Sequence, residues 1–131
     1  MTRDRMVTAT PQAAVLEVAG LMLDHDIGAV MVIQNGVLGG ILSERDIVVR
    51  VVAPGRDART VRVGAVMTRH PVSVHPDVTL GYAMLLMQEH GVRHLPVVES
   101  GKPIGMVTAR VALDPELEEF VCEVRRRETF R

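Results

Sequence analysis

The chain has 131 residues, a formal net charge of −1, 47% apolar residues and only 2% aromatic ones. This length suits one compact folding unit, and the near-neutral charge argues against nucleic-acid binding, which depends on neutralising phosphates. The single cysteine excludes an intramolecular disulfide, and there is neither a signal-peptide pattern nor an apolar run of membrane-spanning length, so we expect a soluble, cytoplasmic protein without membrane contact.

The first predicted elements are a short strand at residues 7–9 and a helix that starts at Thr10-Pro11, a capping residue followed by a proline suited to a first helical turn. Apolar residues then recur at helical spacing and form one stripe: Val15, Val18, Ala19 and Met22. Two β-rich runs at residues 29–33 and 37–42 flank the turn signal Gln34-Asn35-Gly36. This pattern predicts a β-hairpin.

Ser43 can cap a second helix, which starts directly after it and ends before Pro54-Gly55. Residues 61–67 suggest a further short helix. Near the end of the chain, Asp114-Pro115 predicts the start of a C-terminal helix. Three arginines at its far end, residues 125–127, complement the helix dipole, which explains them without an anionic partner.

The sequence repeats itself after 65 residues. Residues 7–48 align with residues 72–113 over 42 positions without a gap, and nine pairs are identical. The identical pairs are Val7/Val72, Pro11/Pro76, Leu21/Leu86, Met22/Met87, His25/His90, Val32/Val97, Gly36/Gly101, Gly40/Gly105 and Arg45/Arg110. The apolar stripe of the first helix recurs as Leu80, Ala83, Met84 and Met87. Each copy is therefore predicted to be strand, helix, strand, strand, helix, and such copies usually cover each other's apolar faces.

The segment from Gly40 to Asp46 combines three features that suit a ligand. A glycine lets a ligand approach the backbone, Ser43 offers a hydroxyl, and Asp46 can accept two hydrogen bonds from a vicinal diol such as a ribose. The same residues also have an explanation without a ligand, because Ser43 can cap the helix and Asp46 can complement its dipole. The segment alone does not decide between these interpretations.

The sequence contains none of the common catalytic motifs, such as Gly-x-Ser-x-Gly, a Walker loop or His-Glu-x-x-His. His25 and His90 occupy equivalent positions in the two copies, which indicates a structural role. We therefore expect no catalytic residue, no metal site and no required cofactor.

Several features together resemble the CBS domain: the repeat, the Gly-x-x-Ser/Thr-x-x-Asp segment, and the stretches Val66–Val74 and Val92–Val97. Residues 1–113 look like a tandem CBS pair, or Bateman module, in a stand-alone chain. The resemblance implies an α/β (α+β) fold in which two β-α-β-β-α repeats pack sheet to sheet. It places CBS repeat 1 at residues 1–53, a linker at 54–65 and CBS repeat 2 at 66–113, and the C-terminal helix predicted from the sequence follows at 114–131.

The resemblance further implies that an adenine nucleotide, AMP, ADP or ATP, binds in a cleft between the two repeats. Its ribose would be held by Ser43 and Asp46, with Gly40 and Leu42 beside them. The other implied site residues are Pro71, Val72 and Ser73, which would line the base, and Arg93, His94 and Arg110, which would face the phosphates. A cationic ligand such as S-adenosylmethionine gains nothing from these arginines and is the less favoured alternative.

The second copy departs from this pattern. Val111 stands where Asp46 has its carboxylate, although Thr108 keeps a hydroxyl. The first-copy counterparts of the phosphate-facing pair, Gly28 and Ala29, are uncharged. We therefore expect one good nucleotide site and a weaker second one.

The main alternative function is a structural or protein-interaction module with a vestigial nucleotide pocket, which ion pairing of Arg93 with Glu99 or Glu44 would favour. Nucleic-acid binding is a third possibility, against which the charge argues. Because CBS pairs commonly dimerise through exposed helices, the resemblance implies a homodimer that regulates an unidentified protein. Residues 47–52 and 117–124 are the candidate contact surfaces.

Overall fold

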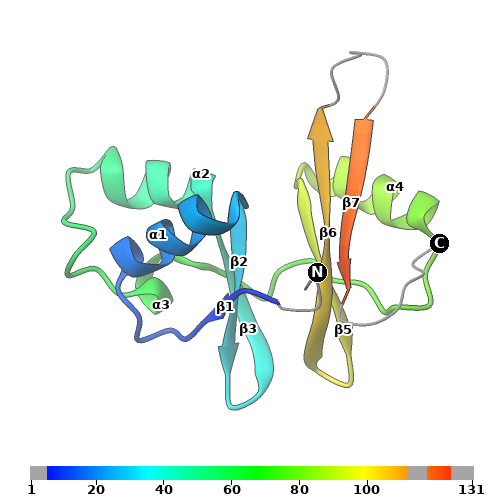
Figure 1. Ribbon diagram of the computed structural model, residues 1–131, viewed down its shortest axis with the longest axis horizontal. Helices are drawn as coiled ribbons and strands as arrows, with labels where there is room; N and C mark the ends of the chain where they lie inside the picture. The colour runs from blue at the N-terminus through cyan, green and yellow to red at the C-terminus, as the bar shows by residue number, and fades with distance from the viewer. Residues whose placement is uncertain (1–5, 112–117, 125–131) are drawn as a thin grey trace. The chain divides into compact units, whose positions relative to one another are not determined.

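The computed structural model of the chain describes residues 6–111 and 118–124. The chain divides into two compact units, which we call the N-terminal unit, Val7–Pro71, and the C-terminal unit, which runs from Val72 onward. Each unit combines a β-sheet with helical segments (Figure 1). The mixed α+β class predicted from the sequence is therefore confirmed.

The sheet of the N-terminal unit has the strand order β1-β2-β3-β4. Its strands are β1 Thr8–Ala9, β2 Ala29–Gln34, β3 Val37–Ser43 and β4 Thr68–Arg69. β1 runs parallel to β2, and the other neighbours are antiparallel. The predicted hairpin is confirmed: Asn35 and Gly36 adopt φ angles of 55° and 80°, the left-handed pair that a tight type I′ turn needs.

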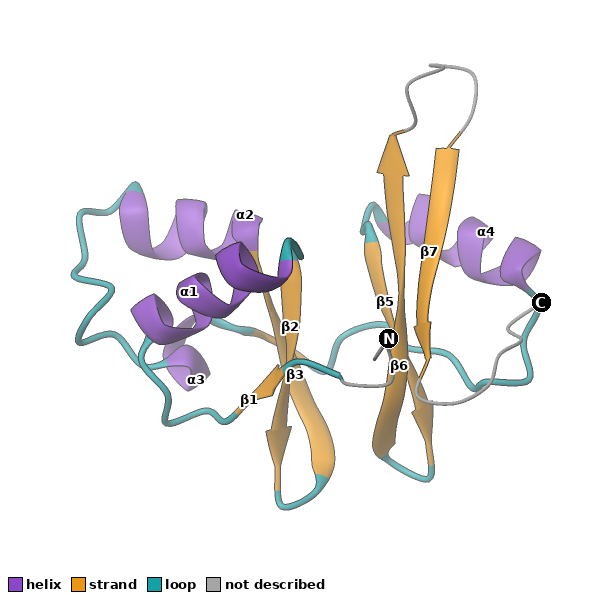
Figure 2. Cartoon of the chain, viewed as in Figure 1, coloured by secondary structure: helices purple, strands orange, loops and turns teal. Residues whose placement is uncertain are grey.

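The helices of this unit lie on one side of its sheet (Figure 2). They are α1 Val15–His25, α2 Glu44–Ile47, the π-helical turn η1 Val48–Val52 and α3 Val63–Val66. α2 and η1 follow each other directly and together form the predicted second helix. α3 is the short helix expected in residues 61–67.

The predicted start of α1 at Thr10-Pro11 is wrong. The helix begins at Val15, after Ala14, and no side chain caps it. Its first free amides are instead satisfied from a distant part of the chain: the amide of Val15 donates to the carbonyl of Val61 at 2.9 Å, and that of Leu16 to the carbonyl of Ala58 at 2.9 Å. Because these carbonyls replace a cap, the helix start is set by long-range contacts.

The core of the N-terminal unit gathers the buried face of α1 onto the sheet and the later helices. Three of the four stripe residues, Val15, Val18 and Met22, are buried, and Ala19 is half-buried. The other core residues are Val30, Val32, Leu42, Val51, Val61, Val63, Val66 and Met67. All are aliphatic or Met side chains, as the low aromatic content requires.

The C-terminal unit repeats this plan with the strand order β5-β6-β7. Its elements are α4 Leu80–His90, β5 His94–Glu99, β6 Lys102–Val111 and β7 Glu118–Val124. The repeat extends to the register, because the parallel pair Ala9↔Val32 recurs as the bridge Val74↔Val97, at the same offset of 65 residues. The tight turn also recurs, with Ser100 at φ 54° and Gly101 at φ 80°.

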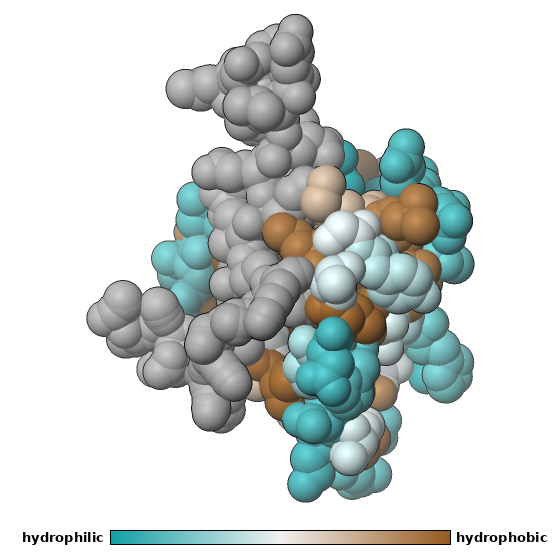
Figure 3. All heavy atoms as spheres, turned by 90° about the vertical axis from the view of Figure 1, so that its right-hand side faces the viewer, coloured by the Kyte–Doolittle hydropathy of each residue, from teal (hydrophilic) through white to brown (hydrophobic). Residues whose placement is uncertain are grey.

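The apolar stripe of α4 is less buried than that of α1. Ala83 and Met87 are buried and Leu80 is half-buried, whereas Met84 is exposed, contrary to the prediction. Tyr82 and Leu85 are exposed on the same helix. Figure 3, which shows the face on the right-hand side of Figure 1, has hydrophobic side chains at the surface. The remaining core residues of the unit are Val74, Leu95, Val97, Val107 and Ala109.

Two predicted helices of the second copy are wrong where the structure describes them. The helix expected after Thr108 does not begin within the described residues there, because β6 continues as a strand to Val111. The C-terminal helix expected over residues 114–131 is replaced by a strand at Glu118–Val124, and the rest of that range lies outside the described residues. β7 pairs with β6 along its whole length and so satisfies backbone groups that would otherwise form an open edge.

Candidate functional site

The candidate site is built where β3 ends and α2 begins. Ser43 is the N-cap of α2, in extended conformation, and its Oγ accepts a hydrogen bond from the amide of Asp46 at 3.1 Å. In return, the amide of Ser43 donates to Oδ2 of Asp46 at 2.9 Å. This reciprocal pair is a capping box, which satisfies two amides at the helix start. The capping role predicted for Ser43 is confirmed.

Asp46 is only 7% exposed, and its carboxylate has contacts with side chains or amides of three other residues. Besides the capping box, the hydroxyl of Ser43 lies 3.0 Å from Oδ2, and the hydroxyl of Thr68 on β4 donates to Oδ1 at 3.0 Å. The guanidinium of Arg50 lies 3.8 Å from Oδ1. A buried carboxylate needs such partners, because burial without them is costly.

Arg50 links this carboxylate to the segment before β4. Its Nη1 donates to the carbonyls of Val66, at 2.9 Å, and Met67, at 3.1 Å. These carbonyls lie at the C-terminal end of α3, where helix carbonyls lack partners within the helix. One side chain on η1 therefore fixes the approach to Thr68.

Sequence reasoning missed the roles of Thr68 and Arg50. Thr68 lies 22 residues from Asp46, and no local pattern connects the two. It does belong to the stretch Val66–Val74, which resembles the CBS domain, but no property of the sequence shows that its hydroxyl reaches Asp46. Arg50 shows only the i, i+4 spacing to Asp46 that allows an ion pair on a helix.

Gly40 and Leu42, which the resemblance places beside the ribose, also have structural roles in the N-terminal unit. A Cβ added at Gly40 would lie 2.6 Å from Sδ of Met67 and 2.8 Å from the carbonyl oxygen of Thr68, so the glycine admits the close approach of β4. Leu42 is fully buried in the core. Its side chain therefore belongs to the core beside the candidate site, and contact of this residue with a ligand stays a prediction.

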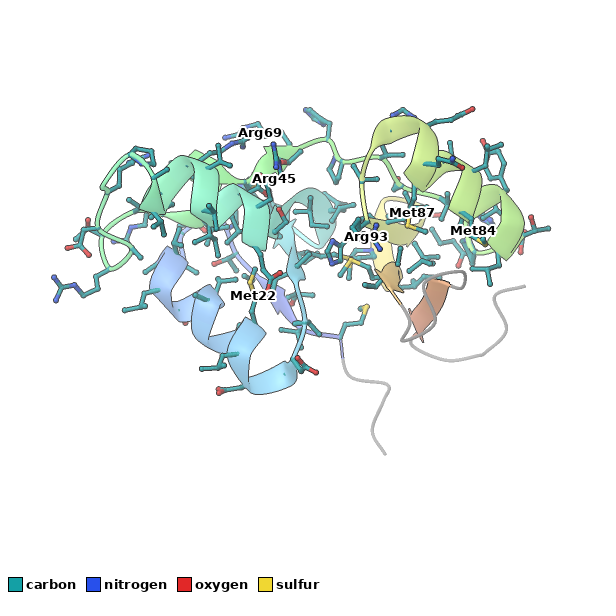
Figure 4. The ribbon with its side chains drawn as sticks, turned by 90° about the horizontal axis from the view of Figure 1, so that it is seen from above. Met22, Arg45, Arg69, Met84, Met87 and Arg93 are labelled. Carbon is teal, nitrogen blue, oxygen red and sulfur yellow. The ribbon has the colours of Figure 1, made fainter. Side chains whose placement is uncertain are left out.

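Asp46 and Thr68 each have an arginine as a sequence neighbour. Arg45 and Arg69 are both exposed, and Figure 4 shows them on the same side of the N-terminal unit. Nη2 of Arg69 donates to the carbonyl of Gly64 at 3.1 Å. These side chains place positive charge near Asp46 within one unit.

The residues implied for the base and the phosphates are divided between the units. Pro71 ends the N-terminal unit and is half-buried. In the C-terminal unit, Val72 is half-buried, Ser73 and Arg93 are exposed, and the side chain of Arg110 lies outside the described part. The cleft between the repeats, with all of these residues in it, stays a prediction.

The C-terminal unit has a corresponding strand end. His94 pairs with Thr108 in the same register in which Ala29 pairs with Ser43. Burial, with a contribution from the charge of Arg93, lowers the pKa of His94 below its usual value. The imidazole is therefore neutral at neutral pH, and the positive charge at this strand end belongs to Arg93.

Metal binding and membrane insertion find no support in the described residues. No group of three His, Cys, Asp or Glu side chains among them is placed to hold a metal ion. Nδ1 of His75 accepts a hydrogen bond from the amide of Asp77 at 3.1 Å, and its ring lies 3.5 Å from the carboxylate of Asp77 and 3.8 Å from that of Glu99. Within the described part of the chain, no helix has the length and apolar character needed to cross a membrane.

Comparison with known proteins identifies the family. The family model of the CBS domain matches residues 1–53 and 63–114. The chain belongs to the CBS-domain family. The CBS domain-containing protein YhcV of Bacillus subtilis is 40% identical over 103 residues, which cover 79% of this chain and 73% of YhcV.

Two further proteins show how this CBS pair compares in length and fold. An uncharacterized protein of Methanopyrus kandleri, MK0525, is 33% identical over 118 residues, and the match covers 88% of this chain but only 60% of that protein. A putative signal-transduction protein with CBS domains from Burkholderia ambifaria has a solved structure that is 35% identical, with a TM-score of 0.75. That match covers 80% of this chain and 77% of the other.

Proposed function

We propose that this CBS pair is a non-catalytic regulatory module that binds an adenine nucleotide, AMP, ADP or ATP, at Asp46. The observation that carries the proposal is the buried Asp46 carboxylate beside Ser43 at the end of β3. A vicinal diol can donate to such a carboxylate, and tandem CBS modules are generally regulatory and nucleotide-binding. No catalytic role is proposed, because a carboxylate that holds a ribose transfers no proton in a reaction.

The positive charges favour a ligand that carries phosphate. Arg45 and Arg69 lie in the N-terminal unit near Asp46, and Arg93 contributes an exposed guanidinium in the C-terminal unit. Guanidinium groups form charge-assisted hydrogen bonds to phosphate oxygens. S-adenosylmethionine offers a sulfonium cation in place of a phosphate and is expected to bind more weakly than AMP, ADP or ATP.

We further propose that binding signals through the packing of the two repeats. A ligand that prefers one arrangement of the repeats shifts the population toward it and changes the surface offered to a regulated protein. A homodimer and a location in the cytoplasm belong to the same proposal. The exposed apolar residues Val48, Val49 and Val52 of η1 suit a dimer contact.

The second candidate function is an interaction module without a ligand. It is favoured by the hydrogen bonds of Asp46, which already has donors from Ser43 and Thr68 within its own unit. In this case the carboxylate serves only to join α2 to β4.

Calorimetric titration of nucleotide-stripped protein with AMP, ADP, ATP and S-adenosylmethionine tests the proposal. We expect one phosphate-bearing nucleotide to bind per chain, and Asp46→Ala to abolish binding. Asp24→Ala is the matched control, because it removes an exposed carboxylate at the end of α1 in the same unit. If folded wild-type protein binds none of the four compounds, the interaction module is the better conclusion.

A further inference from the structure

The hydrogen bonds of Asp46 leave few acceptor positions on its carboxylate for a ligand. An ionised carboxylate can accept about four hydrogen bonds, two at each oxygen. Oδ2 already accepts from the amide and the hydroxyl of Ser43, at 2.9 and 3.0 Å. Oδ1 accepts from the hydroxyl of Thr68 at 3.0 Å and has Arg50 at 3.8 Å. A diol that donates two hydrogen bonds must therefore replace a donor that the protein itself supplies.

The donors of Ser43 and Thr68 differ in how firmly they are held. The amide of Ser43 donates as part of the capping box, and Oγ of Ser43 accepts from the amide of Asp46, so neither group can leave Oδ2 without opening the start of α2. Thr68 lies on β4, a strand of only two residues that pairs with Gly40 and Ile41. Its hydroxyl can turn away from Asp46 by a side-chain rotation, without breaking any backbone pairing. Thr68 is therefore the donor that yields.

We infer that Thr68 competes with ligand hydroxyls for Oδ1 of Asp46 and so sets the affinity of the site for diol ligands. The inference rests on the proposed function, because it assumes that a nucleotide ribose donates to Asp46. Thr68 acts here through Asp46 and is an affinity-determining residue, distinct from the residues that hold the ligand.

Arg50 keeps this competitor in place. Its guanidinium binds the carbonyls of Val66 and Met67, the two residues directly before Thr68. The same guanidinium lies 3.8 Å from the carboxylate, so it maintains both partners of the bond between Thr68 and Asp46. A ligand that displaces the Thr68 hydroxyl works against this tether.

The position of Thr68 gives the displacement a consequence for regulation. Thr68 precedes Pro71 by three residues, and Pro71 is the last residue of the N-terminal unit. The strand that loses its side-chain contact with Asp46 is therefore the one from which the chain passes into the C-terminal unit. We expect the loss of this contact to loosen the two-residue strand β4 and so the start of the connection between the two repeats.

Titration of the full chain with AMP and with 2′,3′-dideoxyadenosine monophosphate, which has no diol, tests the inference. Thr68→Val removes the competing hydroxyl at nearly constant volume, and we expect it to tighten AMP binding by about 10-fold, the effect of one hydrogen bond to a charged group. Thr68→Ser keeps the hydroxyl and should restore wild-type affinity. Affinity for the dideoxy compound should be the same in wild type and Thr68→Val.

The outcomes separate the inference from the proposed function. AMP binding that is unchanged or weakened in folded Thr68→Val overturns the inference and leaves the proposed function intact, whereas no AMP binding by wild type or variant overturns both. Amide hydrogen exchange of the wild-type protein gives a second test that needs no variant. We expect saturating AMP, but not the dideoxy compound, to speed exchange in Thr68–Arg69, and unchanged or slower exchange with AMP counts against the inference.

Discussion

The ends of β3 and β6, at Ser43 and Thr108, have the same strand pairing, but the chain takes different conformations after them. Both follow the same hairpin, with the same register to the preceding strand and a hydroxyl at the last paired position. After Ser43 the chain turns into α2, whereas after Thr108 it continues as a strand to Val111. The position that differs is Asp46, whose carboxylate closes a capping box, against Val111, whose side chain has no hydrogen-bonding atom. One carboxylate thus contributes both to the helix start and to the candidate ligand site.

The largest effect is expected from removing that carboxylate. Asp46→Ala abolishes the capping box and leaves the hydroxyl of Thr68 without its acceptor, so the free energy of unfolding should fall by about 3 kcal/mol. Urea denaturation measures this change. The control Asp24→Ala should stay within about 0.5 kcal/mol of wild type, as an exposed substitution does. A small loss in Asp46→Ala would mean that the helix start does not depend on the box.

A second substitution tests how closely β4 must approach β3. Gly40→Ala places a Cβ 2.8 Å from the carbonyl oxygen of Thr68, so we expect a loss of about 2 kcal/mol in the free energy of unfolding. Gly39→Ala is the matched control, because its nearest contact is an ordinary 3.6 Å to the carbonyl oxygen of Val32. Equal melting temperatures for the two variants would contradict this account.

The tight turns should respond equally in both copies. Gly36 and Gly101 share a φ of 80°, in the left-handed region that side chains disfavour. Gly36→Ala and Gly101→Ala should each cost about 1 kcal/mol of unfolding free energy, measured by urea denaturation. A clear inequality between them would show that the repeat is less symmetrical in energy than in backbone geometry.

The smallest effect is a pH dependence confined to the second copy. Because burial lowers the pKa of His94, the unfolded chain takes up a proton there more readily than the folded chain. Stability should therefore be constant above the unfolded pKa of about 6.5, fall as the pH drops below it, and level off below the folded pKa. Urea midpoints between pH 7.5 and 5 should show this fall in wild type and in the exposed control His90→Gln, but less of it in His94→Gln.

Local chemistry made much of the fold predictable. The two hairpins, the buried stripe of α1 and the cap at Ser43 all depend on residues within a few positions of each other. The start of α1 was mispredicted because its amides are satisfied by Ala58 and Val61, more than forty residues away in the sequence. Glu118–Val124 has a helical pattern of apolar residues, but pairing with β6 decides its conformation.

The residues of the candidate site also differ in whether local spacing or long-range contacts determine their role. Ser43 and Asp46 could be found from their spacing, because a capping box is a local motif. Thr68 and Arg50 could not, because their contacts depend on how α3 and β4 return to the sheet. Gly40 is predicted from the sequence to let a ligand approach the backbone, and the structure shows β4 of the same chain in close approach to it.

The π-helical turn η1 makes the Asp46 site sensitive to the number of residues between Asp46 and Arg50. In this turn the amide of Ala53 donates to the carbonyl of Val48 at 2.8 Å, so the winding contains one residue more than an α-helix would use. Deleting a single residue between Asp46 and Arg50 would rotate Arg50 by about 100° around the helix axis, away from the carbonyls that it binds. Insertions and deletions in Ile47–Val49 are therefore expected to be as damaging to the Asp46 site as substitutions in the site itself.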